Sequence, residues 1–98
     1  MTTNKEFFES KLHNFSQYCH QHLTNIKYQK LLCIIRQINN LKIEAAISHF
    51  YAIVKPIGVQ KYLEQILQQV DLTESDFDPD HLNKIKQYIE CFLAIVSQ

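Results

Sequence analysis

Apolar residues recur along this chain at alternating intervals of three and four, with polar residues between them. This spacing places the apolar side chains along one face of an α-helix. Breaks are few, because the chain contains one glycine, Gly58, and two prolines, Pro56 and Pro79, and no β-hairpin signal is present. The pattern predicts an all-α fold, an antiparallel helical bundle of four to five helices that forms a single domain over residues 1–98.

The first predicted helix begins at a capping box formed by Thr3 and Glu6 and runs to about Leu23. Continuing the same phase beyond that point would place mostly polar residues on the apolar face, so we expect a break at Thr24-Asn25. The apolar positions of this helix are Phe8, Leu12, Phe15 and Cys19, with His22 in the next position.

The second predicted helix is apolar on most sides, which is typical of the central and most buried helix of a bundle. We expect it to end at Asn39-Asn40, because asparagine is poor in helix interiors and tolerates the left-handed cap conformation. Its apolar positions are Tyr28, Leu31, Ile35 and Ile38, and it also carries Leu32, Cys33 and Ile34.

The second half of the chain predicts three further helices. The third should end before Pro56, because proline disfavours the helical conformation of the residue that precedes it. The fourth leads into an acidic linker from Asp71 to Asp78, and Asp78-Pro79 then has the form of an N-cap followed by the first helical residue. The apolar positions of the three helices are Ile43, Ile47, Phe50 and Val54; Val59, Leu63, Ile66 and Val70; and Leu82, Ile85, Ile89, Phe92 and Val96.

Composition narrows the classes of partner and the compartment. Ten basic residues balance ten acidic ones, and Arg36 is the one arginine, which argues against nucleic-acid binding. No apolar run approaches the ~20 residues that span a bilayer, so we expect no membrane contact. The cysteines Cys19, Cys33 and Cys91 are odd in number and widely spaced. We expect buried, free thiols in a reducing compartment and a cytoplasmic protein.

Two segments resemble sites at first sight. In Cys19-His20-Gln21-His22 the histidines are two apart and point in different directions on a helix. His22 could pair with Cys19, three residues away, with His13, His49 or Cys33 as further ligands from elsewhere in the chain. The acidic linker lacks the glycine and glutamate that an EF-hand requires, and no phosphate-binding loop or nucleophile motif is present. We therefore expect no metal, no cofactor and no enzymatic activity.

Two adjacent aromatic pairs carry the functional prediction. In Phe7-Phe8 and Phe50-Tyr51 one member must lie off the apolar face of its helix, where it is able to contact a partner. We take Phe7, Phe8, Phe50 and Tyr51 as candidate partner-binding residues. The hypothesis is a small non-enzymatic protein–protein interaction module, such as a regulator, adaptor, immunity-type inhibitor or chaperone-like subunit, which could also form a homo-oligomer.

An alternative function is DNA binding by the two helices around Gly58, arranged as a helix-turn-helix with Lys55 and Lys61 near the duplex. Two features weigh against it: Pro56 falls inside the turn, and Glu64 falls at a position that should be buried. A recognition helix without arginine would also contact phosphate weakly.

Overall fold

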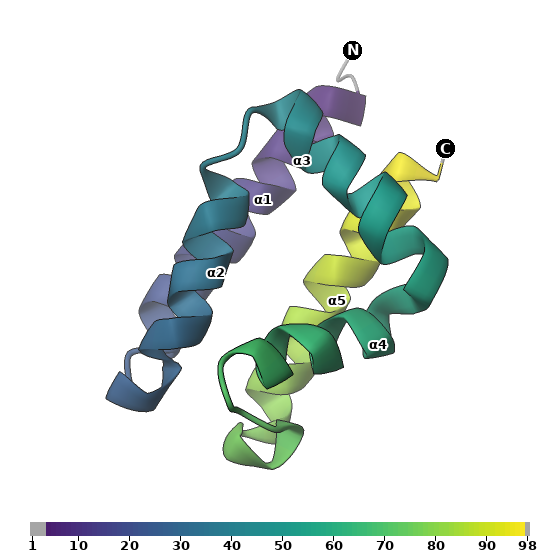
Figure 1. The fold of residues 1–98 in the computed structure, drawn as a ribbon. Coiled ribbons are helices and arrows are strands. Elements are labelled where there is room, and N and C mark those ends of the chain that lie inside the picture. The colour runs from purple at the N-terminus through teal and green to yellow at the C-terminus, as the bar shows by residue number, and fades with distance from the viewer. Residues whose placement is uncertain (1–3, 98) are drawn as a thin grey trace.

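The computed structural model describes residues 4–97, which form α-helices connected by short turns, with no strand in that range. The all-α helical bundle expected from the apolar spacing is therefore confirmed. Figure 1 shows α1 and α5 side by side and antiparallel, with α2 beside α1 and with α4 running across the direction of these helices. The helices are α1 (Asn4–His22), α2 (Gln29–Asn39), α3 (Ile43–His49), α4 (Lys55–Gln69) and α5 (Pro79–Val96).

The central helix is α5, and the expectation that the second helix is the central one was wrong. α5 packs against α1, against α4 and against the turn that joins α3 to α4, whereas α2 lies at one side of the bundle against α1 and, less extensively, α4. An edge helix cannot bury residues on all its sides. Cys33, which we expected to be buried, is accordingly exposed, and Ile34 is only partly buried.

The core centres on Phe92, whose side chain is fully buried in the C-terminal half of α5. Its ring centre lies 5.1 Å from that of Phe8, 4.9 Å from that of Phe50 and 5.9 Å from that of Phe15. Edge-on and tilted arrangements at these separations are favourable because each ring presents a positive edge to a negative face. The apolar positions predicted for α1, namely Phe8, Leu12, Phe15 and Cys19, are all buried.

The end of α1 differs from the prediction in one position. Leu23, four residues after Cys19, enters the core, whereas His22 is exposed. The predicted break at Thr24-Asn25 is confirmed, because the Asn25 side chain accepts a hydrogen bond from the Lys27 amide and begins a short 3-10 turn, Ile26–Tyr28. Thr3, the expected capping residue at the other end of α1, lies outside the described residues.

The third helix does not stop before Pro56. It passes from α3 through a π-helical turn, Phe50–Val54, into α4, and breaks only at Gly58 (φ 84°, ψ 167°). Lys55, directly before the proline, is helical, and its amide donates to the Phe50 carbonyl five residues back. Proline normally clashes with the carbonyl four residues before it, and the wider π turn moves the backbone out of that register.

The acidic linker is ordered by its own side chains rather than being an open loop. α4 ends with Asp71 in the left-handed conformation (φ 59°), where the Leu72 amide donates to the Leu67 carbonyl. An Asp76 carboxylate oxygen then accepts from the Thr73 amide at 2.8 Å. Asp78 caps α5 as predicted, with its carboxylate accepting from the Asp80 amide at 2.9 Å. These carboxylates therefore serve as helix and turn caps.

Tyr28 connects the turn between α1 and α2 with the linker between α4 and α5. Its hydroxyl donates to the Asp76 carbonyl at 2.7 Å, and its ring stacks on Phe77 with 4.7 Å between ring centres. A buried aromatic ring with a satisfied hydroxyl fixes both segments at once. The α1–α2 turn and the α4–α5 linker are therefore held together although they are far apart in the sequence.

Candidate protein-binding surface

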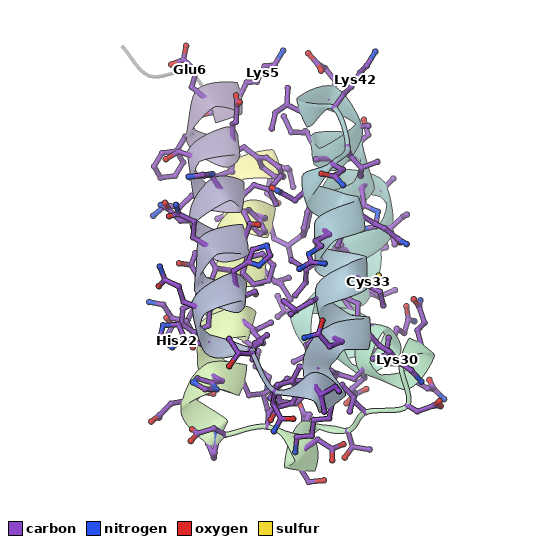
Figure 2. The ribbon with its side chains drawn as sticks, turned by 90° about the vertical axis from the view of Figure 1, so that its left-hand side faces the viewer. Lys5, Glu6, His22, Lys30, Cys33 and Lys42 are labelled. Carbon is purple, nitrogen blue, oxygen red and sulfur yellow. The ribbon has the colours of Figure 1, made fainter. Side chains whose placement is uncertain are left out.

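Large apolar side chains are exposed mainly at one end of the bundle. Lys5 of α1 pairs with Glu44 of α3 at this end, and Figure 2 shows Lys5, Glu6 and Lys42 there. The beginning of α1, the α2–α3 turn and the π turn contribute the exposed side chains. Four exposed apolar side chains make up the surface that we call the apolar end: Phe7, Leu41, Tyr51 and Ile53. Ile26, at the opposite end, is the other exposed large apolar residue of the described chain.

The structure divides each aromatic pair between the core and the surface. Phe7 is 45% exposed and Tyr51 is 56% exposed, whereas Phe8 and Phe50 are buried and their rings lie 5.6 Å apart. Adjacent residues on a helix differ by about 100° in direction, so both members cannot face the core. Phe8 and Phe50 are therefore core residues, and their inclusion among the partner-binding candidates was wrong. Phe7 and Tyr51 remain candidates.

Lysine side chains lie over both exposed aromatic rings. Lys11 Nζ is 5.4 Å from the ring centre of Phe7, and Lys55 Nζ is 4.8 Å from that of Tyr51. Each is four residues after its ring in a continuous helical segment, the spacing at which helical side chains meet. A cation over a ring contributes ~0.5–1 kcal/mol at an exposed site. The apolar end therefore presents aromatic surface together with positive charge.

The π turn gives this end a shape that sequence reasoning missed. Phe50 and Val54 are buried on its inner side, while Tyr51 and Ile53 are about half exposed on the flanks. A π turn contains more residues than an α turn, so its side chains point in directions that differ from those of a regular α-helix. The signal available in the sequence was Pro56, which marks an interrupted helix but does not distinguish a stop from a π turn.

A concave surface lies at the junction of α4 with the acidic linker. It encloses about 700 Å³, and Leu67 and Leu72 contribute apolar side chains to it. Glu64, Asp71 and Glu74 also line it, and Glu74 is paired with Lys86 at 3.3 Å. Hydrogen bonds from Gln60 and Lys86 lower the pKa of Glu74. The charge of Glu74 is therefore already balanced within the chain.

The segment Cys19-His20-Gln21-His22 does not form the metal site that it resembles in the sequence. Cys19 is fully buried, and burial raises the pKa of its thiol to about 12, which disfavours the thiolate that binds metals or attacks substrates. His22 is exposed and lies outside the core. Figure 2 shows Cys33 on the side of α2 away from α1. Residues 4–97 contain no group of three or more His, Cys, Asp or Glu residues placed to hold one metal ion.

The helices on either side of Gly58 do not have the form of a helix-turn-helix. That motif needs a turn of three to four residues between two helices, whereas here a single non-helical residue separates helical segments. Lys55 is occupied by its contact with Tyr51. The geometry therefore adds no support to the DNA-binding alternative.

His49 provides a pH-dependent contact behind the apolar end. Its Nε2 lies 2.7 Å from the Tyr62 hydroxyl, and burial lowers the pKa of His49 from the usual 6.5. The unfolded chain therefore takes up a proton on His49 at a higher pH than the folded chain. The free energy of unfolding should be unaffected by this group above pH ~7 and should fall as the pH drops through 6.5.

Nuclear magnetic resonance titration of the histidine rings, combined with urea unfolding at several pH values, tests this expectation. We expect the His49 signal to titrate below 6.5, and a His49→Gln variant to lose less stability than the wild type on acidification. A His49 pKa at or above the usual value would contradict the account.

No protein-family model, no curated protein and no solved structure matches this chain. In the described residues, no helix is long and apolar enough to cross a membrane.

Proposed function

We propose that this protein is a small, non-enzymatic protein–protein interaction module that contacts its partner through the apolar end. The proposal places it among regulators, adaptors, inhibitors of the immunity type or chaperone-like subunits. The free cysteines, one of them exposed on α2, support a reducing compartment, so we place this activity in the cytoplasm.

One observation carries the proposal: two aromatic side chains, Phe7 and Tyr51, stay about half exposed although the domain buries their sequence neighbours. Exposed aromatic residues contribute a large share of the binding energy at protein interfaces, because they bury much apolar area with few torsions to restrict. Lys11 and Lys55 beside them favour a partner surface that combines apolar groups with carboxylates. A second copy of this chain would bring like charges together and is the less favoured occupant.

Capture from the native lysate, with and without nuclease, tests the class of function. The bait is the full chain with a small affinity tag, and the proposal expects a stoichiometric protein partner that remains bound after nuclease treatment. Co-elution that disappears with nuclease would replace it by the DNA-binding alternative. Recovery of the bait alone as a defined oligomer would replace it by self-association.

A further inference from the structure

Two histidines that are distant in the sequence meet where α1 ends and α5 begins. His22 is in the last turn of α1 and His81 is in the first turn of α5, and their ring centres are 5.7 Å apart. Figure 2 shows His22 at this end of α1, beside the start of α5. We propose that His22 and His81 form a two-histidine site for a divalent transition-metal ion.

The separation of the rings suits a shared ion. Metal–nitrogen bonds are ~2.0–2.1 Å long and a ring nitrogen lies about 1.1 Å from its ring centre, so two imidazoles on one ion have centres roughly 4.5 Å apart when the bonds meet at 90° and roughly 5.2 Å apart at the tetrahedral angle. His22 is exposed and His81 is partly buried, and the site requires both side chains to rotate so that their nitrogens face one ion. Because the described chain offers no third protein ligand here, water fills the remaining positions.

The surroundings hold the rings in place and favour positive charge. Tyr18 lies against His22 with 4.6 Å between ring centres and against His81 at 6.2 Å. Asp78 is the N-cap of α5 and Asp80 lies in its first turn, close to His81 in the sequence. These two carboxylates offset the positive end of the α5 dipole, and the negative end of the α1 dipole also favours a cation near His22.

The donor set selects the kind of ion. Imidazole nitrogen binds nickel, copper and zinc in preference to magnesium or calcium, which require oxygen ligands. The thiol of Cys19 is excluded as a ligand because it is buried in the core. Nickel is the most useful probe, since its affinity for nitrogen ligands is high and it does not oxidise the exposed thiol of Cys33 as copper would.

Calorimetric titration of the untagged full chain with Ni²⁺, at about pH 7.5 where imidazole is neutral, tests the site. We expect one ion per chain, no binding of Mg²⁺, and a Tm increase of roughly 5 °C or more at a free concentration of about ten times Kd. Replacing either ligand, as in His22→Gln or His81→Gln, should weaken Kd by at least ~tenfold.

His13→Gln and His20→Gln are the matched controls, because both histidines are exposed on the same helix as His22. They should leave Kd unchanged, and all four variants should have the wild-type Tm in EDTA. Absence of stoichiometric Ni²⁺ binding would overturn the proposal. So would binding that survives both His22→Gln and His81→Gln, or that is lost equally in His20→Gln. The outcome is independent of the protein–protein function proposed above.

Discussion

Replacing Phe50 by alanine should lower the free energy of unfolding by about 3–5 kcal/mol, as expected when a fully buried phenylalanine leaves a cavity. The Phe50 ring is 2% exposed and contacts the rings of Phe8, Phe92 and Tyr62. A domain of this size has a total stability of ~5–15 kcal/mol. The variant should therefore lose a large fraction of its stability, which urea unfolding followed by circular dichroism measures directly.

Tyr51→Ala is the matched control, because it removes the adjacent aromatic ring from the same turn. Tyr51 is 56% exposed, and its contact with Lys55 is a surface contact. We expect a change of no more than about 1 kcal/mol. Similar losses in the two variants would contradict the division of this pair between the core and the surface.

Gly58→Ala should destabilise the protein by about 1–3 kcal/mol through the backbone alone. The φ of 84° and ψ of 167° at Gly58 lie in a region that is essentially restricted to glycine. A Cβ at this position would have no atom within 4 Å, so the loss cannot come from a steric clash with the surroundings. Thermal unfolding should show a Tm decrease of roughly 4 °C or more.

Chemical synthesis with D-alanine at position 58 separates conformational strain from other causes. The mirror-image residue accepts a positive φ without strain, so this variant should be at least as stable as the wild type. A D-alanine variant as unstable as Gly58→Ala would show that the positive φ is not the origin of the loss.

Much of the core was predictable because helical periodicity depends on local sequence. Leu12, Ile35 and Ile89 fall at the expected intervals and are buried, and Asp78-Pro79 begins α5 as capping preferences require. Local rules also predicted that one member of each aromatic pair would leave the apolar face. The same spacing placed Phe8 and Phe50 on the apolar face, and both are buried.

The predictions that failed concern features that are determined by tertiary contacts. Cys33 is exposed because α2 lies at an edge of the bundle, and edge position depends on how distant segments pack. The helix continues through Pro56 because a π turn accommodates the proline, which spacing alone does not reveal. The approach of His22 to His81 depends on α1 and α5 being antiparallel neighbours. In each case the deciding partner is far away in the sequence.

The central claim is that the exposed members of the aromatic pairs bind a partner protein. The most direct measurement is quantitative capture from nuclease-treated native lysate by wild type, Phe7→Asp, Tyr51→Asp and Ile26→Asp. Ile26 is the matched control, because it is 85% exposed at the opposite end of the bundle. The account predicts that Ile26→Asp retains the partner and that Phe7→Asp and Tyr51→Asp lose most of it while remaining folded. Retention by all three variants, or loss only in Ile26→Asp, would contradict it.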